Sequence, residues 1–137
     1  MPKRVRGSLG AASRAEARLA AFERLVDRAL TGIPSPFRET LAEVAIVIED
    51  EPSIEQLIEN GLGPDETLYG LYEGVPRTEW AADWAISPNR ITLFRFPLED
   101  DHPDPAALEV EVRRTVVHEL AHHLGIDDDR LDELGLG

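Results

Sequence analysis

Two histidines and a glutamate stand together near the end of the sequence, in the order His118-Glu119-Leu120-Ala121-His122. Residues four apart on a helix lie about 40° apart around its axis and one turn apart along it, so both imidazoles can bind one metal ion. Glu119 is offset to the side, where its carboxylate can hold and deprotonate a water molecule. Because a zinc ion brings the pKa of a coordinated water to about 7, this spacing predicts metal-assisted hydrolysis with Glu119 as general base.

A carboxylate follows the histidine pair at a spacing that suits a third ligand. Catalytic zinc sites usually have three protein ligands, and the sequence contains no cysteine to supply one. Gly125 can adopt a left-handed conformation that ends the helix and turns the chain back, which lets Asp128 reach the same ion. Asp128 is the preferred candidate and Asp127 is the alternative. A solvated acidic cluster with no role as a ligand is the third possibility.

The run HELAHHLGIDD, from His118 to Asp128, resembles the extended zinc motif of metzincin-like peptidases, in which a histidine usually stands at the position of Asp128. The chain resembles more closely a family of minimal zincin-like metallopeptidases from bacteria, largely actinobacteria. This similarity covers roughly residues 35–135 and is carried by the segments 70–76, 90–95 and 118–134.

The resemblance implies a zincin-like fold, a Zn²⁺ ion held by His118, His122 and Asp128, Glu119 as general base, and a peptide or protein substrate. The only methionine is Met1, so the methionine turn that supports the ligands of larger metzincins is not expected. An alternative is therefore a catalytically weak or inactive zincin-fold module that binds metal or another protein. A nuclease, as in small bacterial ribosomal-RNA maturation proteins with a similar histidine run, is a further alternative.

The charge of the chain argues against a nucleic-acid partner. Its formal net charge is −13, which repels phosphate backbones and anionic membrane surfaces. No apolar run is long enough for a transmembrane helix, and the basic start lacks the apolar core of a signal peptide. The absence of cysteine fits a reducing compartment, so we expect a cytoplasmic protein. The oligomeric state is left open by these features.

A long helix must carry the site. Asp104 as N-cap and Pro105 at the first helical position predict its start, and Gly125 predicts its end after Leu124. One face of this helix is predicted to pack on the core while the histidines face a cleft. The residues of the core-facing side are Val112, Val116, Leu120, Ala121 and Leu124.

The other predicted elements form an α+β arrangement, in which a small mixed sheet of about three strands packs on helices. The expected strands are 44–48, 67–72 and 91–96, and the expected shorter helices are 14–30, 34–42, 53–60 and 129–134. Ser13 is the predicted cap of the first helix, so residues 1–12 are expected to be a disordered tail and residues 13–137 a single zincin-like domain. Residues 91–96 are expected at a sheet edge, where an extended substrate can pair.

Two further histidines are not expected to bind the metal. His123 points about 100° away from His122, as a supporting or surface residue, and His102 lies in an acidic, solvated loop. Residues 77–89 are expected to form an irregular or weakly helical loop. Aromatic residues of this part of the chain are predicted to pack in the core rather than line a cleft: Tyr69, Tyr72, Trp80 and Trp84.

Overall fold

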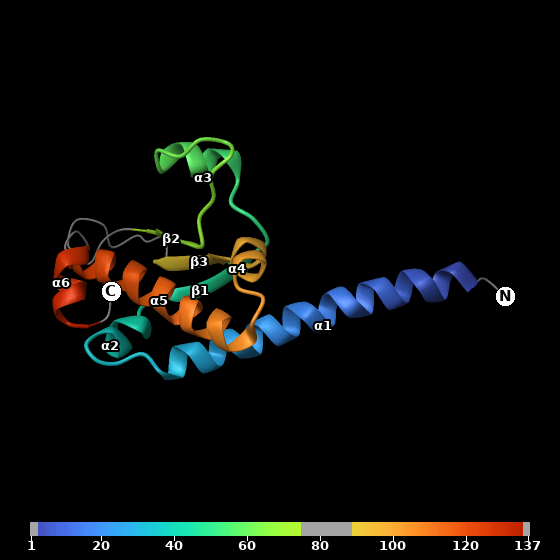
Figure 1. Ribbon diagram of the computed structural model, residues 1–137, viewed down its shortest axis with the longest axis horizontal. Coiled ribbons are helices and arrows are strands. Elements are labelled where there is room, and N and C mark those ends of the chain that lie inside the picture. The colour runs from blue at the N-terminus through green and yellow to red at the C-terminus, as the bar shows by residue number, and fades with distance from the viewer. Residues whose placement is uncertain (1–2, 75–88, 136–137) are drawn as a thin grey trace.

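The computed structural model describes residues 3–74 and 89–135, which form six helices and three strands within those ranges (Figure 1). The predicted irregular loop at 77–89, with Trp80 and Trp84, lies outside the described residues except for Asn89. Helices cover the sheet, so the α+β class predicted from the sequence is confirmed. Within the described residues, no helix is both long enough and apolar enough to span a membrane.

The sheet has the strand order β1-β3-β2. Its strands are β1 (Ala45–Glu49), β2 (Gly70–Glu73) and β3 (Arg90–Phe94). The central strand, β3, pairs with β1 in parallel and with β2 in antiparallel orientation. The prediction that residues 91–96 form a sheet edge is therefore wrong, because both sides of β3 are occupied. β2 and β1 are the outer strands.

The third strand is also shorter than predicted. It ends at Phe94, and helix α4 (Arg95–Asp101) begins at the next residue. Pro97 is the third residue of this helix. The first N–H groups of a helix have no partner within it, so a proline costs no hydrogen bond there.

Helix α1 (Lys3–Thr31) begins eleven residues before its predicted start at residue 14, so the prediction of Ser13 as its cap is wrong. Good helix formers such as Ala11 and Ala12 precede Ser13 and let the helix continue through it. The packed part of α1 begins at Phe22, and the part before it extends away from the body in Figure 1. The prediction of a domain that begins at residue 13 stays a prediction.

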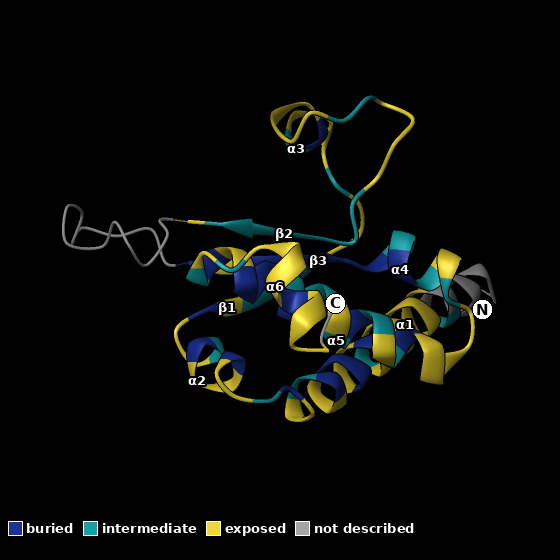
Figure 2. Cartoon of the chain, turned by 60° about the vertical axis from the view of Figure 1, so that its left-hand side comes forward, coloured by how far each residue is buried: buried dark blue, intermediate teal, exposed yellow. Residues whose placement is uncertain are grey.

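The long helix α5 (Pro105–Leu124) has the predicted boundaries. The carboxylate of Asp104 accepts a hydrogen bond from the N–H of Ala107, and Gly125 has the left-handed φ of 75°. Figure 2 shows the buried residues concentrated where α5, the end of α1 and β3 face one another. Four of the five residues predicted to face the core are buried, and Leu124 packs against the core: Val112, Val116, Leu120, Ala121 and Leu124.

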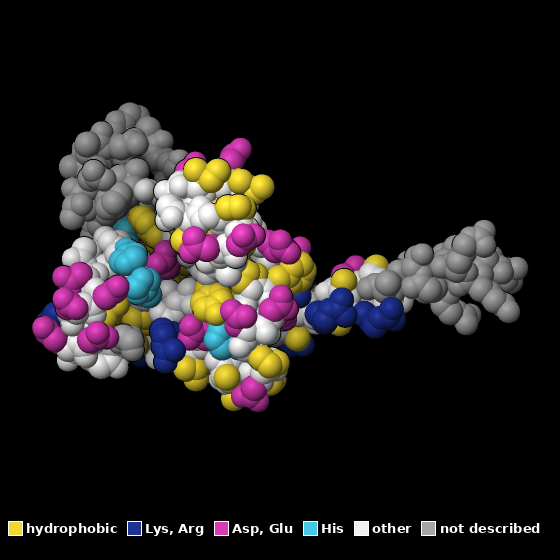
Figure 3. Space-filling model, turned by 45° about the horizontal axis from the view of Figure 1, so that its top comes forward, with side chains coloured by type: hydrophobic (Ala, Val, Ile, Leu, Met, Phe, Trp, Pro, Cys, Tyr) yellow, Lys and Arg dark blue, Asp and Glu magenta, His cyan; other side chains and the backbone are white. Residues whose placement is uncertain are grey.

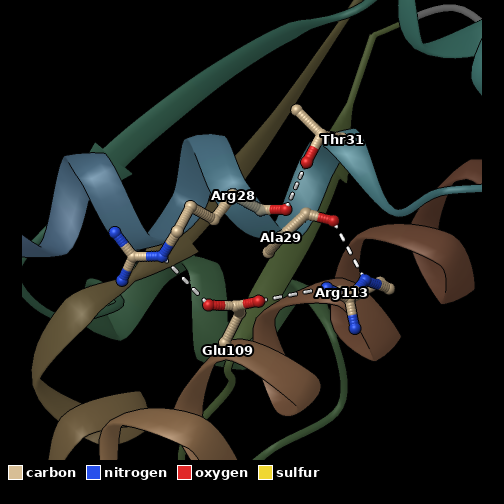
Figure 4. A network of polar contacts seen from close by, with 5 residues as sticks. All are labelled: Arg28, Ala29, Thr31, Glu109 and Arg113. Carbon is tan, nitrogen blue, oxygen red and sulfur yellow. Dashed lines mark hydrogen bonds and ion pairs between the residues drawn. The ribbon is translucent and has the colours of Figure 1, made fainter.

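Polar contacts fix α1 against α5, as Figure 4 shows. The two carboxylate oxygens of Glu109 accept hydrogen bonds from Arg28 at 3.1 Å and from Arg113 at 3.3 Å. Arg113 also donates to the carbonyl of Ala29 at 3.0 Å, and the Thr31 hydroxyl donates to the carbonyl of Arg28. Both arginines and the glutamate keep partial exposure, so these contacts orient the two helices more than they stabilise the fold.

Three short helices complete the described chain. They are α2 (Phe37–Leu41), α3 (Ile54–Glu59) and α6 (Asp128–Glu133). The helix predicted at 53–60 is confirmed as α3. Its start is capped, because the Ser53 hydroxyl accepts from the N–H of Gln56 and the Gln56 side chain accepts from the N–H of Ser53. In Figure 2, α3 stands away from the sheet, whereas α6 lies beside the end of α5.

β2 lies unusually close to α5 at Gly70. A Cβ atom at Gly70 would lie 2.6 Å from Cγ2 of Thr115 on α5 and 3.3 Å from the carbonyl oxygen of Thr92 on β3. We therefore expect Gly70→Ala to lower the free energy of unfolding, measured with urea, by about 1–3 kcal/mol, because the strand must move away from the helix. The matched control is Gly63→Ala, whose new methyl would lie 3.7 Å from the Glu66 carboxylate, an ordinary van der Waals contact.

A second substitution tests the cause of this loss. Thr115→Ser removes Cγ2, so it should restore part of the stability of Gly70→Ala. Equal stabilities of Gly70→Ala and Gly63→Ala would show that the approach of β2 to α5 is not limited by this contact.

Candidate metal centre

The histidine pair of α5 lies at the surface, one helical turn apart. The ring centroids of His118 and His122 are 4.4 Å apart, with the rings edge to face. Together with Glu119 they form a group in which one ligand atom from each residue lies within 4.8 Å of the others. Figure 3 shows histidine side chains exposed on one face, with carboxylates gathered beside them. The geometry of the helix thus brings the three residues of the motif together, as predicted.

Glu119 is buried, and its carboxylate is held by the sheet. Oε1 accepts a hydrogen bond of 2.7 Å from the main-chain N–H of Tyr72 on β2. Oε2 lies 3.5 Å from Nδ1 of His122, so this second oxygen faces the histidine pair. A strand 47 residues earlier in the chain therefore fixes the orientation of the carboxylate.

The turn after α5 separates the two candidate third ligands. Gly125 ends the helix in the left-handed conformation, and the N–H of Ile126 donates back to the carbonyl of Ala121. The Asp127 carboxylate then caps α6 by accepting from the N–H of Arg130 at 2.9 Å. Asp128 points to the site instead, with Oδ1 3.3 Å from Nδ1 of His118. Asp128 lies outside the group of three described above, at its rim.

Two hollows lie beside the histidines. One, of about 330 Å³, has His122, Gly125 and both aspartates of the turn among its lining residues. The other, of about 300 Å³, lies on the side of α5 toward the beginning of the helix. Its lining residues are Tyr69, Gly70, Glu111, Arg114, Thr115, His118 and Leu131. The site therefore has space for a ligand on both sides of the histidine pair.

His123 is only 1% exposed, so it supports the fold beneath the site and is not a surface residue. Its Nδ1 lies 2.7 Å from the hydroxyl of Tyr72, and its Nε2 lies 3.9 Å from Oε2 of Glu43. Burial raises the pKa of the Tyr72 phenol above its ordinary value. The link between Tyr72 and the motif was not predicted from the sequence. The signal that could have found it is that His123 stands four residues after Glu119, on the same side of the helix.

His102 does not join the site. It follows α4, where its Nδ1 lies 2.9 Å from the carbonyl oxygen of Leu98 and its ring packs edge to face on Tyr69. The Tyr69 hydroxyl donates to Asp101, and this hydrogen bond raises the pKa of Tyr69 to about 12. Tyr69 and Tyr72 both pack against the hydrophobic core, as predicted, but Tyr69 also lines the hollow beside His118, which was not predicted.

The donor set fits a zinc ion. Two imidazoles and a nearby carboxylate are ligands that zinc prefers, and the buried glutamate between them is available for acid–base chemistry. The imidazole of His118 and the carboxylate of Asp128 already lie 3.3 Å apart, so both can turn toward one ion.

Comparison with known proteins agrees with this chemistry. No curated protein matches the chain. A family described as zincin-like metallopeptidase matches residues 41–137, which is more than half of the chain and contains all three strands and the site. Zinc is the metal that this kind of family typically binds. On this match, and on the α+β architecture that carries the His118-Glu119-His122 group, the chain belongs to the zincin-like metallopeptidase family and has a minimal zincin-like fold.

Proposed function

We propose that this protein is a zinc-dependent peptidase that hydrolyses peptide bonds. The observation that carries the proposal is the arrangement of Glu119, whose one carboxylate oxygen is held by β2 while the other faces the histidine pair. A carboxylate in this position can serve as a general base without occupying a ligand position.

In this proposal His118, His122 and Asp128 hold the ion. Zinc, when bound, polarises the scissile carbonyl and lowers the pKa of the attacking water. The preference for Asp128 over Asp127 is supported by the contact of Asp128 with His118 and by the role of Asp127 as the cap of α6.

Glu119 moves the proton in both halves of the reaction. Its Oε2 takes a proton from the water as the water oxygen bonds to the carbonyl carbon. The same carboxyl group then gives this proton to the leaving nitrogen as the carbon–nitrogen bond breaks, which yields a carboxylate and an amine. The hydrogen bond from Tyr72 to Oε1 keeps Oε2 directed at the reacting atoms throughout.

β2, and not β3, is the strand that suits an extended substrate. The N–H of Phe94 donates to the carbonyl of Tyr69, so the main-chain groups of Gly70 point away from β3 in the alternating antiparallel pattern. A substrate paired there lies along α5 beside His118. The hollow of about 300 Å³ between Gly70, Thr115 and Leu131 then accommodates one of its side chains.

The zinc content of the purified protein tests whether the proposed ligands bind a metal ion. We expect about one zinc per chain, by mass spectrometry of protein purified without chelator, and loss of this zinc in His118→Ala. The zinc-loaded protein should cleave a peptide library, a chelator should stop cleavage, and added zinc should restore it. Failure to bind zinc even after addition would overturn the proposal. Zinc binding without cleavage would favour a metal-binding or protein-interaction module on the same fold.

A further inference from the structure

Tyr72 contacts α5 at two points that lie one helical turn apart. Its main-chain N–H donates to Oε1 of Glu119 at 2.7 Å, and its hydroxyl lies 2.7 Å from Nδ1 of His123. Because Glu119 and His123 are four residues apart, their side chains leave the helix on the same side, one above the other. One residue of β2 is therefore bracketed by two polar side chains of the helix that carries the motif.

The contact between the Tyr72 hydroxyl and His123 is buried. The His123 ring is 1% exposed and packs against the Tyr72 ring at a centroid distance of 5.2 Å. A phenol that donates to Nδ1 places the ring proton on Nε2, the nitrogen that faces Glu43 at 3.9 Å. A buried polar contact of this kind favours one arrangement of the packed elements, since a shifted strand would leave buried polar atoms without their partners.

The position of β2 decides where Glu119 points. Glu119 reaches the main chain of β2 with one oxygen, and its other oxygen lies 3.5 Å from His122. A displacement of β2 along or away from α5 would release Oε1 and allow the carboxylate to rotate. Small misplacements of a reacting group lower rates strongly, because the reacting atoms no longer meet in the productive geometry.

We propose that Tyr72 is a positioning residue for Glu119, because the contact of its hydroxyl with His123 fixes β2 at the distance from α5 at which its N–H holds the carboxylate. The effect on catalysis rests on the proposed peptidase function. The effect on the position of β2 does not, since it is a property of the metal-free protein.

The test compares Tyr72→Phe with Tyr69→Phe. Both changes remove one phenol oxygen near β2, but the Tyr69 hydroxyl donates to Asp101 of α4 instead of contacting His123. Because Tyr69 also lines the hollow beside His118, Tyr69→Phe is the control for amide exchange only, and kcat is compared with the wild-type protein. In the metal-free protein we expect hydrogen exchange of the residue-72 amide, measured by NMR, to become about tenfold faster in Tyr72→Phe relative to Tyr69→Phe. In the zinc-loaded protein we expect kcat to fall about tenfold with an unchanged KM and unchanged zinc content.

A change at the partner residue keeps the test decisive if Tyr72→Phe fails to fold. His123→Asn retains a polar atom near the position of Nδ1, whereas His123→Leu does not, so His123→Asn should keep slower amide exchange at residue 72 and a higher kcat. Equal exchange rates in Tyr72→Phe and Tyr69→Phe, or equal rates in the two His123 variants, would overturn the proposal. If the wild-type protein cleaves no peptide, the peptidase proposal fails. The exchange rates alone then test whether Tyr72 fixes the position of β2.

Discussion

Glu119→Gln is expected to lower kcat for peptide hydrolysis by about 1,000-fold while zinc remains bound, because an amide cannot accept the proton of the attacking water. Glutamine keeps a carbonyl oxygen at the position of Oε1, so the hydrogen bond from the N–H of Tyr72 and the position of β2 are retained. The measurement is kcat on a cleaved peptide, with zinc content determined on the same sample.

The matched control is Glu109→Gln on the same helix. Glu109 contacts Arg28 and Arg113 on the side of α5 that faces α1, away from the histidine pair. This variant should keep wild-type activity. An active Glu119→Gln protein would exclude Glu119 as the general base, even if the zinc site itself is intact.

Asp128→Ser is expected to weaken zinc binding on the order of 100-fold, since it removes one of three ligands that share the binding free energy. Its control is Asp127→Ser, which removes the neighbouring carboxylate but keeps a hydroxyl that can cap α6. The affinity of each protein for zinc can be measured by competition with a chelating dye.

The pair of variants separates the two candidates for the third ligand. The assignment of Asp128 predicts a large loss in Asp128→Ser and near wild-type affinity in Asp127→Ser. The reverse pattern would assign the ligand to Asp127. A zinc affinity equal to that of the wild-type protein in both variants would show that neither carboxylate binds the ion.

The sequence alone determined the helix of the site and the three residues at its centre. A helix has a fixed pitch, so the spacing of His118 and His122 sets their relative position as soon as the segment is helical. Its boundaries were equally predictable, because Asp104, Pro105 and Gly125 act on their own local backbone. The same local chemistry explains why the helix predicted at 53–60 starts at Ser53, whose hydroxyl caps α3. It misplaced the start of α1, because a serine caps a helix only where the preceding residues are not helical.

The tertiary structure decided everything that depends on residues distant in the sequence. Strand order is set by how three strands share a core, so the pattern of residues 91–96 could not reveal that β3 is central and β2 an outer strand. Asp127 and Asp128 are chemically equivalent neighbours, and only the turn at Gly125 and the start of α6 direct one to His118 and the other to a helix cap. Glu119 on α5 contacts Tyr72 on β2, which lies 47 residues earlier in the chain, so no local sequence pattern could predict this contact. It forms because β2 packs closely on α5.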